Sequence, residues 1–510
     1  MADSAVRAFY SGKNILITGG SGFVGLCLID KILRDVPEVN TIYILMRPKK
    51  GKDISQRLEE ITKNSIFEKL LESQPTDVLK KLVAVAGDVA EENLGLSDSD
   101  KQMLAEKIQI VVHCAATLDF QQNLRPTVRI NLLGTRRLME LCKQMKGLEA
   151  LVHVSSAYVN SYLKEAHERV YEAPEDADKV IALVSSLDDA SLGPIEKKQL
   201  LGKHPNTYTF TKHLAEHEVM KCSNLFPCTI VRPTMIVAAW KEPVPGWTCS
   251  KVGPQGFLMG ASKGVVRRLP IARDNIADYI PVDVVVNQLL VAGYYAAKSK
   301  SGLTVYHCSS STCNPFRWGS IEHKVNGFLH RYPLRSAVWY PHLKFVSSLW
   351  LFKLSAIFVH FFPAVLLDLM LRITGGRPML VRLHKNVWSS LNRLEKFIFS
   401  EWLFHNPHTR ELAQSLNAVD RKTFYIDIST LNWEDYFINL TIGVRRYLNR
   451  EKPSTLEAAR SKDKMLLFFH VLWQLCLMGA LWWGTATLLG SSMTTAAWSA
   501  PVFYILYSML

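Results

Sequence analysis

Two residues four positions apart, Tyr208 and Lys212, have side chains that can move a proton together. On a helix this spacing puts both side chains on one face. A nearby ammonium favours the phenolate, so a tyrosine with an ordinary pKa of about 10 can act at neutral pH. The lysine can also donate hydrogen bonds to a bound ligand. Because Tyr-x-x-x-Lys often arises by chance, its meaning depends on the surrounding chain.

A candidate substrate-binding hydroxyl precedes this pair. The apolar run 150–154, a predicted strand, leads into Ser155 and Ser156. Open α/β sheets bind ligands at the carboxyl ends of their central strands. Ser156 is therefore the candidate for holding a carbonyl oxygen beside the tyrosine. The alternative is that both serines only cap a turn.

A glycine-rich loop near the start of the chain predicts a dinucleotide site. Its three glycines have TGxxGxxG spacing between an apolar run at 14–18 and a helical pattern at 23–33. Such glycines allow a tight turn, close approach of a pyrophosphate and close helix–sheet packing, while the helix N-terminus offers N–H donors. The residues assigned to this part of the site are Thr18, Gly19, Ser21, Gly22, Phe23, Val24 and Gly25.

The residue after the second predicted strand bears on which dinucleotide binds. Arg47 follows the strand 41–46, where NAD sites usually carry Asp or Glu. A cation there favours the 2′-phosphate of NADP, and Lys49 and Lys50 add positive charge. The sequence therefore predicts NADPH as the cofactor; the alternative is that these cations are simply solvated.

Two further positions are assigned to the cofactor site. Asp88 follows the third predicted strand, 82–86, where a carboxylate can accept from the adenine amine, although Gly-Asp is also a common turn. Ala115 follows the fourth predicted strand. Both positions stand at strand ends, as the ligand-binding edge of a parallel sheet requires.

Alternating strands and helices must position these residues. Continuous apolar strands are predicted at 14–18, 41–46, 82–86, 108–114, 150–154 and 228–231, and helices at 23–33, 131–145 and 208–222. Continuous apolar strands that alternate with helices indicate a parallel sheet covered on both faces. The prediction is a Rossmann-type, doubly wound α/β domain over residues 1–315, with an insertion at 164–205.

Composition narrows the classes of partner. The 510 residues include 60 Lys and Arg against 46 Asp and Glu, a net charge of +14. This excess suits a solvated basic surface, an anionic ligand or a membrane surface; without zinc-finger, RNP or basic-heptad motifs, no nucleic-acid partner is expected. Nine cysteines without a CxxC pair argue against a disulfide scaffold and a metal site, and favour a reducing compartment.

The C-terminal part differs in kind. Residues 465–510 contain no Asp, Glu, Lys or Arg, and 465–489 is long enough to cross ~30 Å of hydrocarbon. The basic residues at 450–464 then predict that the large N-terminal part faces the cytosol. Whether 496–510 forms a second short segment stays open. No signal-peptide pattern is expected before the first strand.

A second apolar stretch, 346–371, includes Lys353 and Asp368, which a clean membrane span tolerates poorly. It is interpreted as a buried or membrane-surface helical segment. Residues 375–450 look helical, because Trp388, Leu391 and Leu394 recur at helical spacing.

Taken together, these motifs resemble the extended short-chain dehydrogenase/reductases, and more specifically the eukaryotic, insect-type fatty acyl-CoA reductases. The stretches that carry the resemblance are 17–25, 45–49, 113–117, 153–160, 208–216 and 230–234, then 426–427, 432–436 and 443–448. The resemblance covers nearly the whole chain. It implies a helical C-terminal domain at 316–455 and a membrane anchor at 465–510.

The resemblance also implies a reaction: a long-chain acyl-CoA and two NADPH give a primary alcohol, CoA and two NADP. Tyr208 would be the proton donor, Lys212 would lower its pKa and hold the ribose, and Ser156 would orient the carbonyl oxygen. Asn131, at the start of the helix after the fourth strand, would serve the proton relay. No cysteine nucleophile is needed.

Two other functions are weighed against this one. A sterol or sugar-nucleotide dehydrogenase or epimerase would share the scaffold but not the C-terminal helical domain. A non-catalytic, cofactor-binding membrane scaffold would be free to lose the Ser156, Tyr208 and Lys212 set. The resemblance implies an endoplasmic reticulum or peroxisome membrane; acyl chain length and oligomeric state, a homo-oligomer included, stay open.

Overall fold

The chain divides into two compact units, and each unit is built from three separate segments of the chain. The computed structural model describes residues 3–48, 51–120, 122–299, 302–499 and 501–503. Unit 1 comprises Met1–Thr248, Ile276–Phe316 and Glu401–Tyr436; unit 2 comprises Cys249–Asn275, Arg317–Ser400 and Phe437–Leu510. Residues 401–436, expected in a C-terminal domain from 316 to 455, therefore contribute to unit 1.

Unit 1 is built on a parallel sheet of seven strands, which confirms the doubly wound α/β prediction. In spatial order the strands are β11 (Leu303–Cys308), β7 (Cys228–Pro233), β5 (Ala150–Val154), β4 (Ile110–His113), β1 (Asn14–Thr18), β2 (Thr41–Met46) and β3 (Leu82–Ala86). The strands bury aliphatic runs; Ile15, Leu16 and Ile17 of β1, for example, are fully buried.

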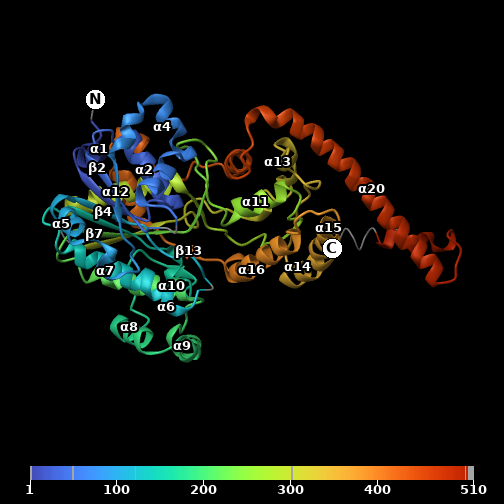
Figure 1. The fold of residues 1–510 in the computed structure, drawn as a ribbon, viewed down its shortest axis with the longest axis horizontal. Coiled ribbons are helices and arrows are strands. Elements are labelled where there is room, and N and C mark those ends of the chain that lie inside the picture. The colour runs from blue at the N-terminus through green and yellow to red at the C-terminus, as the bar shows by residue number, and fades with distance from the viewer. Residues whose placement is uncertain (1–2, 49–50, 121, 300–301, 500, 504–510) are drawn as a thin grey trace. The chain divides into compact units, whose positions relative to one another are not determined.

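Helices cover both faces of this sheet, as Figure 1 shows. One face carries α2 (Phe23–Asp35) and α12 (Val282–Ser299), which pack on each other; the other carries α7 (Leu133–Cys142) and α10 (Thr207–Met220), which also pack together. The smaller helices of this unit include α1 (Ala5–Tyr10), α3 (Ile54–Thr62), α4 (Glu68–Ser73), α5 (Asp98–Lys107), α6 (Leu124–Thr127), α17 (Pro407–Ser415) and α18 (Ala418–Thr423).

The strand order places a switch point at β1. The chain proceeds from β1 to β2 and β3 on one side, then returns to β4 on the other side of β1. Ligands bind such sheets outside the carboxyl ends of the strands at this point. All strands are parallel, so the residues that follow β1 to β5 lie along one edge of the sheet.

The insertion at 164–205 forms local structure of its own. It contains β6 (Glu165–Ala166), α8 (Ala177–Ser186) and α9 (Asp189–Ile195). The short β6 pairs in parallel with β13 (Leu403–Phe404), so this insertion meets the returning segment 401–436.

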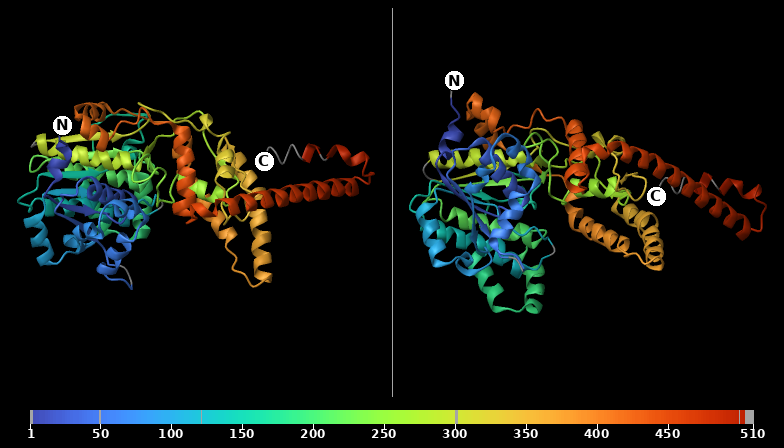
Figure 2. Two further views of the ribbon diagram at one scale, coloured as in Figure 1. Left: turned by 90° about the horizontal axis from the view of Figure 1, so that it is seen from above. Right: turned by 45° about the horizontal axis from the view of Figure 1, so that its top comes forward.

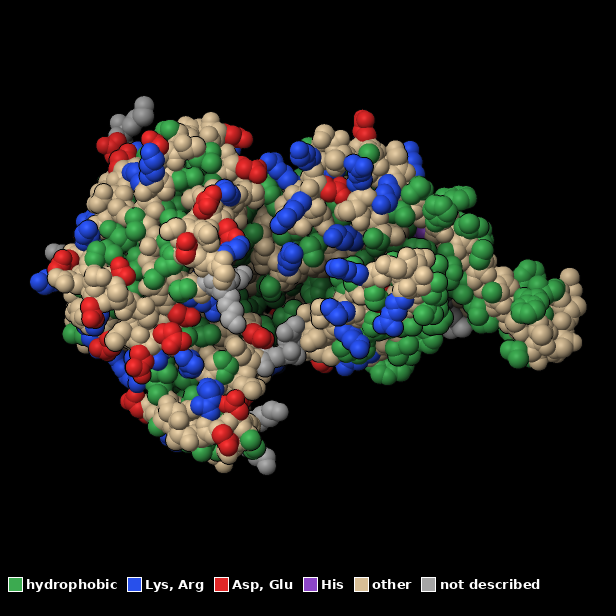
Figure 3. Space-filling view, in the orientation of Figure 1, with side chains coloured by type: hydrophobic (Ala, Val, Ile, Leu, Met, Phe, Trp, Pro, Cys, Tyr) green, Lys and Arg blue, Asp and Glu red, His purple; other side chains and the backbone are tan. Residues whose placement is uncertain are grey.

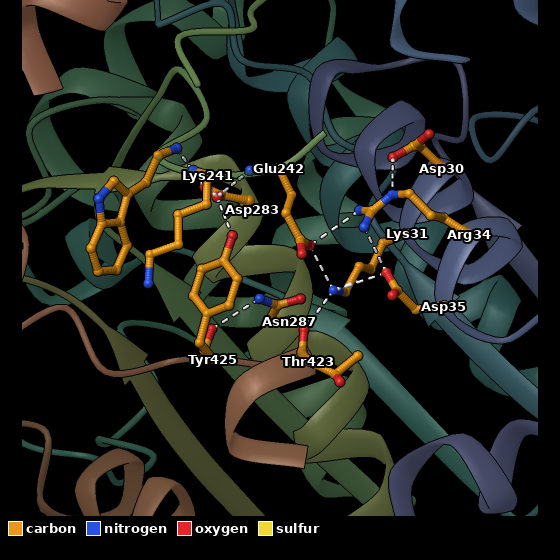
Figure 4. Close-up of polar contacts among 11 residues, drawn as sticks. Asp30, Lys31, Arg34, Asp35, Lys241, Glu242, Asp283, Asn287, Thr423 and Tyr425 are labelled. Atoms are coloured by element: carbon orange, nitrogen blue, oxygen red, sulfur yellow. Dashed lines mark hydrogen bonds and ion pairs between the residues drawn. The ribbon is translucent and has the colours of Figure 1, made fainter. Parts of the chain in front are cut away.

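Polar contacts bind this returning segment into unit 1. Figure 4 shows Lys31 of α2, whose Nζ donates to Glu242 Oε2 and to the carbonyl oxygen of Thr423, both at 2.6 Å. Tyr425 donates its phenol proton to Asp283 of α12 and accepts at its carbonyl from Asn287 Nδ2 at 2.9 Å. Together these contacts fasten residues 423–425 to α2 and α12.

Unit 2 is mainly helical. It comprises α11 (Pro254–Ser262), α13 (Val325–Arg331), α14 (Leu349–Ala356), α15 (Phe362–Ile373), α16 (Leu380–Phe399), α20 (Leu456–Leu488) and the strand pair β9 (Arg268–Pro270) and β12 (Lys344–Val346). The two views of Figure 2 show α20 as a long helix, as its 33 residues require. Among the residues that the structure describes, two helical runs are long and apolar enough to cross a membrane, Leu349–Ile373 and Pro453–Leu488.

Candidate functional site

The glycine loop between β1 and α2 is packed too closely for larger residues. Gly19 has a φ of +73°, and a Cβ there would lie 2.8 Å from the amide nitrogen of Ala115. A Cβ on Gly25 would lie 2.4 Å from the carbonyl oxygen of Gly19. Both glycines are therefore required by the loop itself, which packs directly against Cys114 and Ala115, the two residues after β4.

The N-terminus of α2 is left open by this loop. Gly22 is the N-cap, and no side chain among the described residues caps the helix. Ser21 and Gly22 are exposed, and Phe23 and Val24 are half-buried. Unsatisfied amides and the positive end of the helix dipole favour an anion at this position. The loop therefore fits the pyrophosphate of a dinucleotide.

Thr18 and His113 connect β1 and β4 beneath the loop. Thr18 Oγ1 accepts from the Ala115 amide at 3.2 Å and lies 2.7 Å from His113 Nδ1. His113 Nε2 lies 3.0 Å from Thr135 Oγ1, and burial lowers the pKa of His113 to about 3. A neutral imidazole between two hydroxyls thus fixes the loop at Ala115 relative to Gly19.

Two expected cofactor residues stand at the ends of β2 and β3. Arg47 is exposed directly after β2, and its carbonyl accepts from the Arg57 guanidinium. Asp88, half-buried after β3, accepts at Oδ1 from the Ala90 amide at 3.0 Å and so shapes its own turn. Lys49 and Lys50 lie outside the described residues.

Helix α10 presents Tyr208 and Lys212 at the end of β5. Asn206 begins the helix by accepting the Thr209 amide at its side-chain oxygen, at 2.9 Å. The Nζ atom of Lys212 donates to the carbonyl oxygen of Val154, the last residue of β5, at 2.7 Å. It also lies 3.4 Å from Nε2 of the buried His153. The lysine is thereby positioned at the strand end.

Ser156 and Tyr208 meet at the same place. The Ser156 hydroxyl accepts from the Tyr158 amide at 3.3 Å and is hydrogen-bonded to Tyr208. Burial raises the pKa of Tyr208 to about 12, and the hydrogen bond to Ser156 opposes this shift. The sequence suggested a phenolate stabilised by lysine, whereas burial in the structure keeps the phenol protonated. A protonated phenol is the form that can donate a proton.

Lys212 titrates much closer to neutrality than an exposed lysine. Burial lowers its pKa to about 8, while the Glu216 carboxylate and Cys114 oppose the shift. An ammonium with this pKa is still mostly charged at pH 7. It can therefore donate hydrogen bonds to a ribose hydroxyl at physiological pH.

Asn131 lies within a π-helical turn, Val128–Leu132, that joins α6 to α7. Its Oδ1 accepts from the Thr117 amide at 3.0 Å, and its Nδ2 donates to Thr211 Oγ1 at 3.2 Å. Single π-helical turns inside α-helices occur often at functional sites. Here the side chain of Asn131 connects the loop after β4 to α10 beside the tyrosine and lysine.

A buried ion pair joins α10 to β7 next to the end of β5. The sequence analysis assigned this pair no role. Arg232 of β7 binds Glu216 of α10 through two parallel contacts of 2.8 and 2.6 Å, and both side chains are fully buried. Ser155 donates its hydroxyl proton to Glu216 at 2.5 Å. Two features of the sequence could have indicated this pair. Arg232 directly follows the apolar run 228–231, and Glu216 lies one helical turn after Lys212.

Family models match both parts of the chain. A model described as male sterility protein and named for NAD binding matches residues 17–289, and a second, also described as male sterility protein, matches residues 359–451. The first match spans the glycine loop, Ser156, Tyr208 and Lys212.

Solved structures share the fold. The terminal reductase domain of the myxalamid biosynthetic pathway has a TM-score of 0.56 at 19% identity, covering 86% of this chain and 90% of its own. A reductase domain of a non-ribosomal peptide synthetase from Mycobacterium tuberculosis has a TM-score of 0.54 at 19% identity, covering 88% of this chain and 96% of its own. At this level of identity, both similarities support the fold alone.

Other relatives are much more similar in sequence to this chain than these solved structures are. A Drosophila melanogaster protein classed as a fatty acyl-CoA reductase is 55% identical, with both chains fully covered. Fatty acyl-CoA reductase 1 of Homo sapiens is 37% identical over 457 residues, which are 89% of this chain and 88% of that protein. The chain described here belongs to the fatty acyl-CoA reductase family.

Proposed function

We propose that this protein reduces long-chain fatty acyl-CoA to primary fatty alcohol, with NADPH as the electron donor and CoA as the leaving group. The observation that carries the proposal is the convergence of Ser156, Tyr208 and Lys212 at the carboxyl end of β5. The glycine loop that fits a dinucleotide lies at the same edge of the sheet. The family membership supports acyl-CoA as the substrate class.

The alternatives weighed from the sequence are less well supported. A sterol or sugar-nucleotide enzyme would not be expected to match the second family model over residues 359–451. A scaffold without turnover has no need of a buried lysine bound to the strand end or of a phenol paired with Ser156.

The proposal assigns a part of the cofactor to each of the expected binding residues. The open N-terminus of α2 would bind the pyrophosphate and Lys212 the nicotinamide ribose. The Asp88 carboxylate would accept a hydrogen bond from the adenine amine. Arg47, exposed beyond β2, binds the 2′-phosphate and thereby selects NADPH over NADH. When bound, the cofactor supplies a hydride to the substrate carbonyl carbon.

The first reduction converts the thioester to an aldehyde. The hydroxyls of Ser156 and Tyr208 donate hydrogen bonds to the thioester oxygen, which gathers negative charge as the carbonyl carbon is reduced. Tyr208 gives its proton to that oxygen, and Asn131 and Lys212 support the path by which the phenol regains one. The product of this step is a hemithioacetal. Its carbon–sulfur bond then breaks as its hydroxyl gives up the proton, so that the aldehyde forms and the CoA thiolate leaves and takes that proton.

The second reduction acts on the aldehyde in the same site. Ser156 again orients the oxygen and Tyr208 again protonates it, now giving the alcohol. In total, one acyl-CoA, two NADPH and two protons give one alcohol, one CoA thiol and two NADP. A protonated Tyr208 suits both reductions, because in each of them the oxygen takes up the phenol proton as the carbonyl carbon is reduced.

A membrane location suits the apolar product. We place the anchor at 465–510, most of it within α20, with the reductase unit on the cytosolic side because of the basic residues at 450–464. The membrane is that of the endoplasmic reticulum or the peroxisome. Fractionation of cells after protease treatment of intact membranes tests this orientation: residues 1–315 should be digested from the outside.

A product assay tests the reaction itself. The full-length protein in detergent or vesicles is supplied with long-chain acyl-CoA and either NADPH or NADH, and products are identified by mass spectrometry. Alcohol and free CoA should form, with NADPH much preferred. Aldehyde that accumulates without alcohol would refute the two-step reaction, and equal rates with NADH would refute the role of Arg47.

A further inference from the structure

Unit 2 carries an exposed apolar face along α14, the π-helical turn 357–361 and α15. The exposed side chains on this run are Trp350, Leu351, Ile357, Phe358, Phe362, Val365, Leu366, Leu367, Leu369, Met370 and Ile373. Several are more than half exposed: Trp350 at 68%, Phe362 at 58% and Ile373 at 78%. A continuous apolar surface of this kind marks a binding surface.

The opposite face of the same helical run is fixed to its own unit by polar contacts. His360 Nε2 accepts from the backbone amides of Arg267 and Arg268 at 3.0 and 3.1 Å. Asp368 accepts from the amides of Met379, Leu380 and Val381 at 2.9, 3.0 and 2.9 Å, and so caps the start of α16. The run is therefore amphipathic: one face belongs to the protein and the other faces outward.

The two candidate membrane helices differ in this respect. Only 11% of the apolar window in Pro453–Leu488 is buried, so α20 is exposed nearly all round, as a helix surrounded by lipid must be. In Leu349–Ile373 the buried share is 33%, and it includes His360 and Asp368. One face of this run has polar side chains that contact the protein, and the other face is apolar and exposed. Such a helix is better suited to lie in the plane of a membrane interface than to cross the membrane.

The charges near the exposed apolar face of residues 349–373 indicate what kind of surface that face binds. From residue 323 to 394 the chain has ten Lys or Arg and a single carboxylate, that of Asp368, which is buried. Arg372, Arg377, Arg382 and Lys385 are exposed next to the apolar face. Figure 3 shows basic side chains beside the apolar patch over α14 and α15. Apolar side chains rimmed by cations are complementary to anionic phospholipid.

We propose that residues 349–373 form a membrane-surface element: the helical run lies in the interface of an anionic lipid bilayer, separately from the crossing by α20. Its outward apolar side chains enter the upper acyl region, and the cations at 372–385 contact lipid phosphates. This inference concerns attachment and does not depend on the proposed reaction.

The test uses the unmodified full-length protein in vesicles of phosphatidylcholine with phosphatidylserine. Two photoreactive phosphatidylcholines are compared, one with a diazirine near the headgroup end of the acyl chain and one with it at the chain terminus. Labelled peptides are mapped by mass spectrometry. Leu225 in unit 1, exposed at 64%, supplies a peptide that should stay unlabelled.

The proposal predicts that peptides from 349–373 react with the shallow probe, on outward residues such as Phe358 and Phe362, while α20 reacts with both probes. Equal labelling of 349–373 by the deep probe would mean that the run crosses the bilayer. No lipid label there, or cross-links to a second copy of the chain, would mean that another surface covers the face. Each of these results overturns the proposal.

Charge variants add a second readout. The Arg377→Glu, Lys385→Glu protein should lose shallow labelling of 349–373 by about fivefold for each cation removed, with α20 labelling unchanged. Lys80→Glu, an exposed charge reversal in unit 1, is the matched control and should label as the parent does. Labelling that is indifferent to both the variants and the anionic lipid would contradict the role of charge.

Discussion

The ammonium of Lys212 donates to the carbonyl oxygen of Val154 at 2.7 Å, which ties helix α10 to the carboxyl end of the central strand β5. Because this carbonyl belongs to the last residue of the strand, the lysine stands at the edge where open α/β sheets bind ligands. The same contact places Tyr208, one helical turn earlier, next to Ser156.

Cofactor capture should weaken at alkaline pH. Burial lowers the pKa of Lys212 to about 8, so its ammonium loses the proton as pH rises through that value. We expect kcat/KM for NADPH to fall about tenfold per pH unit above pH 8, since kcat/KM reports groups of the free enzyme. Lys212→Arg should keep the charge and shift the decline to higher pH. A pH profile that is flat from 7 to 10 would exclude a role for this ammonium.

Removing the phenol should stop the chemistry and spare binding. Tyr208→Phe should lower kcat by about 10²–10⁴-fold, the usual range for a general acid. NADPH affinity, followed by cofactor fluorescence, should stay near that of the parent because Lys212 and the glycine loop are intact. Tyr162→Phe, which alters a half-buried phenol elsewhere in unit 1, is the control. Equal activity of the Tyr208 and Tyr162 variants would contradict the mechanism.

Two adjacent serines should give opposite results. Ser156→Ala should reduce kcat with little change in Tm, because its hydroxyl faces Tyr208. Ser155→Ala should instead lower the free energy of unfolding by about 1–3 kcal/mol, because it removes a hydrogen bond to the buried Glu216 carboxylate, which then keeps its contacts with Arg232. Thermal unfolding and steady-state kinetics on both variants separate the two roles.

The ion pair beneath the site should be strongly stabilising in its present context. Arg232→Met leaves the Glu216 carboxylate buried without its guanidinium, which typically costs about 3–5 kcal/mol. The expected result is a large fall in Tm. The double variant Arg232→Met, Glu216→Gln should recover part of it; a double variant less stable than the sum of both single changes would show that the pair is not coupled in this way.

The charge after β2 should control cofactor choice. Arg47→Glu should weaken NADPH binding by about tenfold to a hundredfold and leave NADH binding equal or stronger, because a carboxylate repels the 2′-phosphate and accepts from a 2′-hydroxyl. Lys63→Glu reverses an exposed charge at the C-cap of α3 and is the matched control. Direct titration with both cofactors checks this, and an unchanged preference would remove Arg47 from the site.

Much of the fold was predictable from the sequence, for a physical reason. Strands such as Asn14–Thr18 and Thr41–Met46 are short continuous aliphatic runs, and their bounds match the prediction. The last strand of the sheet, Leu303–Cys308, was not predicted. Thr304 and His307 interrupt its apolar residues, so it lacks the continuous apolar pattern typical of a buried parallel strand.

Other features depend on contacts that no local pattern encodes. A helix was expected to start at Asn131. The helical run in fact starts at Leu124, and Asn131 lies inside its π-helical turn. Hydrophobic periodicity cannot show the extra residue of such a turn. Likewise, nothing in the adjacent letters Ser155 and Ser156 tells which hydroxyl faces Glu216 and which faces Tyr208. Only the packing of α10 on the strand ends decides this.

The central claim is that one carbon receives two hydrides in one site, and an isotope experiment tests it most directly. The full-length protein is given a long-chain acyl-CoA and NADPH that carries deuterium at the transferred position. The account predicts a primary alcohol with two deuterium atoms on C1 and two NADPH oxidised per CoA released. A deuterated aldehyde as the end product, with one NADPH oxidised per CoA, would contradict it.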